Sequence, residues 1–400
     1  MKKIAIIISL MLLFPILLGV RANGPTADFT WQPQHPSTAD RIHFIDESSN
    51  QSQIVERVWY FGDGHGSTEK NPYHKYSRPG TYNVKLVVKW NISGNIIYGE
   101  VNHTIDVANQ PPVADAGPDQ TVNSHTVTFN GSKSYDPDGN ITSWKWYFGD
   151  NTTGQGKVVQ HTYSQDGRYT VTLNVTDDFG ASDEDTCIVI TDTHPPSTTV
   201  NISGKKGING WYVENVTAKL QAQDSLSGVD SIYYRLDNGN WTKYSSQLTI
   251  SKEGSHLLEY YSTDKAGNNE SIKNITIKID KTPPNIEITM PEEGKLYIFG
   301  RAILPLFKTI IIGKIDVKIN ASDNISGISK VIIYVNNEER ANLTSSPYEW
   351  KWGGDMGKRT LKVVAYNGAG LNNSKEMQVR IYSLFKPRNS SAEIAAIENH

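Results

Sequence analysis

The sequence contains a single cysteine among its 400 residues. Cys187 therefore has no partner for a disulfide within the chain, and its alternating context, TCIVIT, is typical of a small buried strand residue. An exported chain without disulfides depends on domains large enough to carry their own hydrophobic cores. The length also favours several domains, because one compact core rarely serves so many residues.

Neither sign of charge is in large excess: the chain has 39 basic and 42 acidic residues, and its net charge is only −3. A nucleic-acid partner would require a basic patch or stripe, so we expect none. Common catalytic motifs are missing as well: there is no GxSxG, no GxxxxGK[ST], no HExxH and no pair of cysteines. These absences predict a protein that is not an enzyme and holds no cofactor, with calcium as the one open alternative.

One long apolar run covers residues 4–20 and follows Lys2 and Lys3. This order of a basic start, an apolar stretch and small residues predicts a secretory signal over residues 1–22. The alternative is an uncleaved anchor, because the run has about the minimum length for a membrane span, although Pro15 interrupts it. Such an anchor is the only membrane attachment that we expect.

A second apolar run, LYIFGRAILPLFKTIIIG, covers residues 296–313. Arg301, Pro305 and Lys308 interrupt it, and charges are costly to bury in lipid. The run therefore predicts core strands and not a membrane span.

Internal repetition organises the chain. Residues 58–88 match residues 145–175 without a gap at an offset of 87 residues. Residues 222–237 match residues 321–336 at an offset of 99. The first offset relates Trp59 to Trp146, Phe61 to Phe148, Asp63 to Asp150, His74 to His161 and Tyr82 to Tyr169.

Double prolines at 111–112, 195–196 and 283–284 separate the repeats and suit short, stiff linkers. Stretches such as TYNVKLVV and RYTVTLNV alternate polar and apolar residues, as half-buried strands do, and long helical periodicity is absent. Several short strands per segment indicate β-sandwiches. The predicted organisation is a signal at 1–22, four domains at 23–108, 109–192, 193–281 and 282–383, and a polar tail at 384–400.

Two stretches carry a family resemblance. WYFGDG…NPYHKYSRPGTYNVKLVV and SYDPDGNITSWKWYFGD…HTYSQDGRYTVTLNVTDDFG resemble polycystic-kidney-disease-type (PKD) domains, although the first copy lacks DPDG. The motifs DSLSGV, DNISGI and TDKAGNN make the two later segments similar to immunoglobulin-like repeats of bacterial and archaeal surface proteins. The resemblance implies an all-β chain of four tandem immunoglobulin-like sandwiches, extracellular and not enzymatic.

The stretch RVWYFGDGHG poses a choice between chemistry and a turn. Asp63 and His65 would suit an acid–base pair or metal ligands, but the second copy has a threonine in place of His65. Glycines on both sides of Asp63 favour a turn, and His74 and His161 are expected to bond to a neighbouring loop. The predicted structural core residues are Trp59, Phe61, Tyr82, Trp146, Phe148 and Tyr169.

The motif DPDG offers the best candidate metal ligands. Asp136 and Asp138 could bind calcium, which favours clusters of oxygen atoms, with Asp115, Asp177 and Asp178 as further donors. The alternative is that Asp-Pro-Asp-Gly only forms a turn.

Seventeen Asn-X-Ser/Thr sequons are compatible with a glycosylated exterior. The glycosylation candidates singled out are Asn91, Asn174, Asn215 and Asn274. Six tryptophans could stack on sugars if they were exposed, whereas in a sandwich they would fill the core. They are Trp31, Trp90, Trp211, Trp241, Trp350 and Trp352.

Together these features predict a secreted or surface protein that serves adhesion, spacing or envelope attachment. The expected partners are cell-envelope proteins or polysaccharides. The alternative is an accessory or polysaccharide-binding component that works with a secreted hydrolase or protease.

Overall fold

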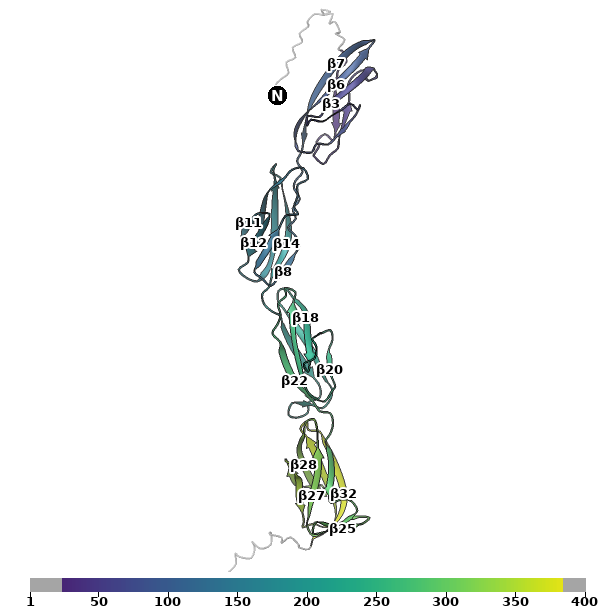
Figure 1. Ribbon diagram of the computed structural model, residues 1–400, viewed down its shortest axis with the longest axis vertical. Helices are drawn as coiled ribbons and strands as arrows, with labels where there is room; N and C mark the ends of the chain where they lie inside the picture. Colours follow the sequence, from purple (N-terminus) through teal and green to yellow (C-terminus); the bar gives the residue numbers. More distant parts are fainter. Residues whose placement is uncertain (1–23, 384–400) are drawn as a thin grey trace, which may run out of the picture. The chain divides into compact units, whose positions relative to one another are not determined.

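The computed structural model describes residues 24–383, so the predicted signal and the predicted polar tail lie outside the described residues. Within this range every regular element is a strand, apart from the single 3-10 turn η1 (Gln51–Gln53). The strands form eight sheets in four successive pairs (Figure 1). The prediction of an all-β fold of immunoglobulin-like sandwiches is therefore confirmed. None of the described residues forms a helix long and apolar enough to span a membrane.

The chain divides into two compact units. The first runs to Gln120 and includes Thr126–Ser164 and Arg168–Val189, whereas the second comprises Thr121–His125, Gln165–Gly167 and the chain from Ile190 onward.

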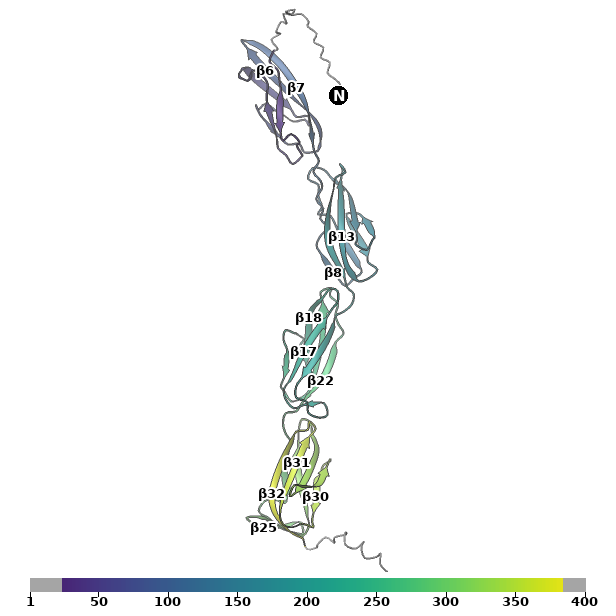
Figure 2. The ribbon, with the colours of Figure 1, turned by 180° about the vertical axis from the view of Figure 1, so that it is seen from behind.

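The first pair of sheets has the strand orders β1-β2-β5 and β4-β3-β6-β7. Its longest strands, β6 and β7, form a hairpin whose turn uses positive φ angles at Ser93 and Gly94 (Figure 2). The strands are β1 (Phe29–Gln32), β2 (Ile42–Asp46), β3 (Ile54–Tyr60), β4 (Gly66–Ser67), β5 (Tyr73–His74), β6 (Gly80–Ile92) and β7 (Asn95–Val107).

The second pair has the orders β12-β9 and β11-β10-β13-β14-β8. Strands β10 and β3 share one sequence of buried and exposed positions, as the repeat at 87 residues predicts. The strands are β8 (Gln120–Val122), β9 (Thr126–Asn130), β10 (Ile141–Tyr147), β11 (Thr153–Gln155), β12 (Val158–Thr162), β13 (Gly167–Asp177) and β14 (Ser182–Thr191).

The third pair has the orders β15-β17-β20 and β16-β22-β21-β18-β19. Its core lies between the two sheets and includes Leu220 from one and Leu258 from the other. The strands are β15 (Ser197–Ser203), β16 (Trp211–Tyr212), β17 (Val216–Gln223), β18 (Val229–Leu236), β19 (Thr242–Lys243), β20 (Leu248–Ile250), β21 (Gly254–Asp264) and β22 (Lys273–Ile279).

The fourth pair has the orders β23-β27-β30 and β25-β24-β26-β32-β31-β28-β29. Trp352 from the smaller sheet packs in one core with Leu361 from the larger sheet. The strands are β23 (Asn285–Met290), β24 (Lys295–Ile298), β25 (Arg301–Pro305), β26 (Thr309–Ile312), β27 (Ile315–Ser322), β28 (Ile328–Val335), β29 (Glu338–Leu343), β30 (Tyr348–Trp352), β31 (Met356–Asn367) and β32 (Asn372–Tyr382).

The prediction of core strands over residues 296–313 is only half correct. Strands β24 and β26 do bury Tyr297 and Ile311, but all five residues of β25 are exposed. β25 pairs with β24 alone at the end of its sheet, so no second strand covers it. Phe299 and Phe307, which flank β25, are exposed as well.

The predicted domain boundaries can be tested by limited proteolysis of the full chain. We expect proteinase K to cut near 109–112, 193–197 and 281–285 before it cuts within paired strands, because linkers lack the continuous pairing that protects a sheet. Mass spectrometry of the first fragments would locate the cuts. Early fragments that end inside β6, β13, β21 or β31 would contradict four separately folded segments.

Candidate functional site

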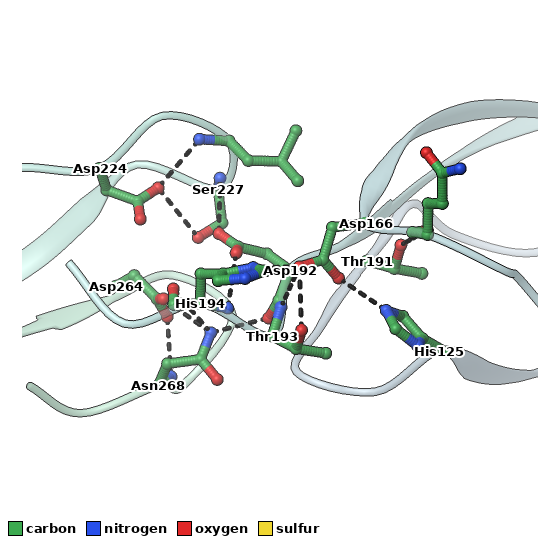
Figure 3. Close-up of polar contacts among 12 residues, drawn as sticks. His125, Asp166, Thr191, Asp192, Thr193, His194, Asp224, Ser227, Asp264 and Asn268 are labelled. Carbon is green, nitrogen blue, oxygen red and sulfur yellow. Dashed lines mark hydrogen bonds and ion pairs between the residues drawn. The ribbon is translucent and has the colours of Figure 1, made fainter.

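Carboxylates gather beside the linker that follows β14. Asp192 is buried, and its Oδ2 accepts a hydrogen bond from the Ser227 N–H at 3.0 Å (Figure 3). Its Oδ1 accepts from the His194 N–H at 3.2 Å. One side chain therefore fastens the linker to the turn between β17 and β18.

Two further carboxylates face Asp192 within the second unit. Asp224 opens the DSLSG turn, where its Oδ1 accepts from the N–H groups of Leu226 and Gly228. Asp264 ends β21, and its Oδ2 accepts from the Asn268 amide at 2.8 Å. One ligand oxygen from each of the three aspartates lies within 4.8 Å of the others. Oxygen clusters of this kind suit a hard cation, although backbone donors already hold each carboxylate.

Asp166 connects the same linker to a neighbouring loop. Its Oδ1 lies 3.0 Å from His125 Nε2, and its Oδ2 lies 2.6 Å from His194 Nδ1. The N–H and hydroxyl of Thr193 also donate to Oδ2. Burial pushes the pKa of Asp166 upward, but the hydrogen bonds from Thr193, His194 and His125 outweigh it and lower the pKa to about 2. Asp166 therefore stays ionised and holds both histidines.

The linker that follows β22 shows a related arrangement in which an amide replaces one carboxylate. Residues 260–268 match residues 363–371 at an offset of 103, which places Asn367 at the position of Asp264. Asn367 is fully buried. Its Nδ2 donates to Asp280 Oδ2 at 2.9 Å and to Asp323 Oδ2 at 3.1 Å. An amide between two carboxylates satisfies both by hydrogen bonding, so this group is closed without a cation.

The predicted calcium ligands lie in the turn before β10. Asp136 Oδ1 accepts from the N–H groups of Asp138 and Gly139 at 3.0 and 3.1 Å. Asp138 is only 8 % exposed, and its Oδ2 accepts from Thr38 Oγ1 and, at 3.0 Å, from the Gln110 N–H. Asp136 therefore stabilises the DPDG turn, as the turn interpretation predicts, and Asp138 also bonds to the linker at Gln110.

Two carboxylate oxygens of this turn, Asp136 Oδ2 and Asp138 Oδ1, are buried without a hydrogen-bond partner, and so is Asn109 Oδ1 in the linker that Asp138 contacts at Gln110. Burial raises the pKa of Asp136, and the adjacent Asp138 carboxylate reinforces the shift. Calcium favours oxygen ligands, and these groups are oxygen donors of that kind.

The other predicted donors lie near this turn with different roles. A Cβ placed on Gly139 would lie 2.3 Å from Asp178 Oδ1 and 2.9 Å from Asp136 Oδ2, so both carboxylates face that glycine. Asp177 accepts from the Asn109 amide at 2.7 Å, and Asp115 bonds to its own loop at Gly117. Asp136 and Asp138 belong to none of the groups of three acidic or histidine ligands found among residues 24–383.

The stretch RVWYFGDGHG forms the end of β3 and a tight turn. Asp63 Oδ1 accepts from the His65 N–H at 3.1 Å, and Asp63 Oδ2 lies 2.7 Å from His74 Nε2. Gly62 has a φ of 88°, and a Cβ there would lie 2.9 Å from the Asn83 carbonyl oxygen. Asp63 is thus a turn residue that also holds a strand-end histidine.

The second PKD-like copy repeats this pair. Asp150 Oδ2 lies 2.7 Å from His161 Nε2, and the His161 ring stacks on Phe148 at 4.0 Å. Sequence reasoning anticipated that each histidine would bond to a loop but did not name its aspartate partner. The signal was available, because both members of the pair recur at the same offset.

The predicted core residues differ in depth. Trp59, Phe61, Trp146 and Phe148 are buried, whereas Tyr82 and Tyr169 are half-buried. Tyr82 stacks on the more deeply buried Tyr76 at 3.9 Å, and Tyr169 stacks on Tyr163 at the same distance. The conserved spacing of these pairs places a tyrosine stack in both copies.

The sequon asparagines lie at the surface. Asn91, Asn215 and Asn274 are exposed, and Asn174 is half-buried with its Nδ2 donating to Glu184 Oε1 at 2.9 Å. Of the six tryptophans considered for sugar stacking, Trp90 and Trp352 are buried and the other four are half-buried. In the four half-buried tryptophans, only part of the ring is exposed and available to stack on a sugar.

Cys187 is buried and free, and burial raises the pKa of its thiol to about 11. A thiol of this kind is inert as a nucleophile.

Comparison with known proteins identifies the modules. Residues 22–103 and 109–191 match the family described as PKD domain, and residues 284–363 match the family described as Bacterial Ig domain. Modules of these two kinds are typically non-catalytic, and the matches include no catalytic domain.

Similar proteins share only part of their length with this chain. Pre-pro-metalloprotease PrtV of Vibrio cholerae is 30% identical over 134 residues, which cover 34% of this chain and 14% of PrtV. Collagenase ColA of Clostridium perfringens is 29% identical over 119 residues, which cover 28% of this chain and 11% of ColA. The PKD1 domain of Vibrio anguillarum Epp is 31% identical, with all of that domain covering 22% of this chain at a TM-score of 0.20. The chain thus contains two PKD domains followed by a bacterial Ig-like domain.

Proposed function

We propose that this chain is a non-catalytic extracellular or cell-surface protein whose tandem sandwiches space or attach a partner at the cell envelope. The observation that carries the proposal is that a side chain ties the linker at each double proline. Asp138 holds Gln110, Asp192 holds Ser227, and Asp280 accepts from Asn367. These bonds fasten each linker to the module that follows it. The likeness of the PKD modules to modules of secreted proteases and collagenases supports a non-catalytic role.

A second candidate function is an accessory region that works with a secreted hydrolase or protease or binds polysaccharide. The resemblance to PrtV and ColA favours it. The half-buried or buried state of all six considered tryptophans weakens the polysaccharide-binding form of this candidate, because stacking on sugars needs an open ring face.

The two candidates can be separated by capture from cell-envelope fractions. The tagged full chain is expected to retain specific envelope proteins or polysaccharides, and to retain less when a chelator is present. Binding to isolated insoluble polysaccharide or to collagen, with no envelope component retained, would instead support the accessory role.

We also propose that calcium binds at Asp136, Asp138 and the Asn109 side-chain oxygen. Each contributes one buried oxygen that has no hydrogen-bond partner. Two carboxylates would balance the ion's charge, and Asn109 lies in the linker. Calcium would therefore bind the second PKD domain and its preceding linker together and make that linker stiffer.

The calcium proposal predicts a rise in thermal stability. In about 2 mM calcium, which matches the affinity range of extracellular modules, the full chain should show one transition at a Tm several degrees higher than in chelator. Scanning calorimetry would measure it, because it resolves separate transitions in a multidomain chain.

Asp138→Ala should abolish this rise, because it removes one orphaned oxygen. Asp323→Asn is the matched control: it alters an aspartate in the DNISG turn, whose carboxylate Asn367 already satisfies, and should leave the rise intact. An equal rise in Asp138→Ala, or no rise in the parent chain, would reject the site.

A further inference from the structure

The first PKD domain brings three ligand-type side chains together at one turn: Asp63, His65 and His74. Asp63 and His65 lie between β3 and β4, and His74 ends β5. One ligand atom from each lies within 4.8 Å of the others. His74 Nε2 and His65 Nδ1 are 2.7 and 3.3 Å from the same atom, Asp63 Oδ2.

These separations are close to those that a small divalent ion requires. In tetrahedral zinc sites the bonds to imidazole nitrogen and carboxylate oxygen are about 2.0–2.2 Å, which sets ligand atoms roughly 3.3–3.5 Å apart. The His65 nitrogen already lies at such a distance from Asp63 Oδ2. The His74 nitrogen would have to retreat by well under 1 Å as an ion replaced its hydrogen bond to Asp63.

Two of the ligands are held in place, and the third can adjust. The His74 ring stacks on Phe61 at 4.2 Å with an interplanar angle of 3°, and the side chains of Asp63 and His74 are 16% and 13% exposed. The His65 side chain is 74% exposed, and Gly64 before it adopts a φ of 92°. A preformed pair beside a movable third ligand allows an ion to enter from solvent.

The second PKD domain shows that the turn does not need His65. There the Asp150–His161 pair has the same separation of 2.7 Å, and Thr152 occupies the position of His65. Thr152 Oγ1 and its N–H both donate to Asp150 Oδ1. His65 makes the corresponding backbone bond to Asp63, so its imidazole is not required for the turn.

We propose that Asp63, His65 and His74 form a binding site for a divalent transition-metal ion of the zinc class. Two imidazoles and one carboxylate suit zinc, copper or nickel, whereas calcium prefers oxygen ligands throughout. Three protein ligands leave one tetrahedral position for water or for a donor group of another molecule.

Titration of the full chain with zinc chloride in a calorimeter tests the site, and the visible absorption of added cobalt reports the ligand geometry. His65→Thr, which copies the turn of the second PKD domain, should remove one equivalent of bound zinc and the corresponding cobalt band. His194→Thr is the control, because a separate group at Asp166, Asp192 and His194 also offers metal ligands. His194→Thr should leave unchanged the zinc equivalent and the cobalt band that His65→Thr removes.

The converse variant is Thr152→His, which gives the second turn the three ligands of the first. It should add one equivalent of zinc and increase the cobalt band. Circular dichroism would check that each variant is folded; His65 and Thr152 are exposed, so both exchanges are tolerable. A His65→Thr chain that binds as many zinc ions as the parent with the same affinity would overturn the proposal.

Discussion

Replacing Trp59 with alanine is expected to lower the free energy of unfolding of the first PKD domain by about 3–5 kcal/mol. The side chain is fully buried, and its ring lies 5.1 Å from Phe29 and 5.8 Å from Phe44 between centroids. Its Nε1 also donates to the Glu69 carbonyl oxygen at 2.9 Å. Alanine would leave a cavity and an unpaired carbonyl, and a loss of this size is a large part of a typical domain's stability.

The measurement is hydrogen exchange of the full chain at increasing denaturant, read at the β6 amides, because a multidomain chain does not unfold in one step. Trp146→Ala should lower the free energy of unfolding read at the β13 amides by a similar amount, while the value read at the β6 amides stays unchanged. Two controls lie in the adjoining turn: His65→Ala should change stability by no more than about 0.5 kcal/mol, and Asp63→Asn should cost far less than Trp59→Ala. A loss below about 1 kcal/mol for Trp59→Ala would show that the tryptophan is not a core anchor.

Replacing Arg57 with methionine is expected to cost about 3–5 kcal/mol, because it leaves a buried carboxylate without its counter-charge. Arg57 Nε lies 2.6 Å from Asp46 Oδ2, and the Asp46 side chain is 0% exposed. Burial raises the pKa of Asp46, yet the hydrogen bonds from Ser48, Arg57 and Gln51 bring it below its ordinary value. The contribution of Asp46 is therefore present above its unfolded pKa and is lost as the pH falls through the lower folded pKa.

The same exchange measurement at β6 tests this pair. Asp46→Asn combined with Arg57→Met should recover part of the loss, because no uncompensated charge then remains buried. Glu56→Gln is the matched control on the same strand: its exposed pair with Lys89, at 3.3 Å, should contribute less than about 1 kcal/mol. If Arg57→Met costs no more than Glu56→Gln, the buried pair does not stabilise the domain. In the second PKD domain Trp144 stands at the repeat position of Arg57, so that domain does without this ion pair.

Part of the candidate chemistry was visible in the sequence and part was not. The DPDG motif identified Asp136 and Asp138 as oxygen donors, because turn carboxylates can be recognised from local spacing. Asn109 was not found, because it lies in a linker 27 residues before Asp136 and only folding brings its side chain to Asp177. At residues 296–313 the sequence predicted too much burial. The apolar residues indicate core strands, but β25 lies at the edge of its sheet and its residues are exposed.

The sequence by itself determined the all-β class and the two PKD repeats, because strand alternation, turn residues and a constant offset are local properties that the chain carries in order. It also identified Trp59, Phe61, Trp146 and Phe148 as core residues, since their recurrence reflects one packing solution used twice. Only the tertiary structure decided which polar side chains meet. Asp63 joins His74 across 11 residues, and Asp192 approaches Asp264 across 72 residues, because hairpins and crossovers between sheets, not sequence distance, set those contacts.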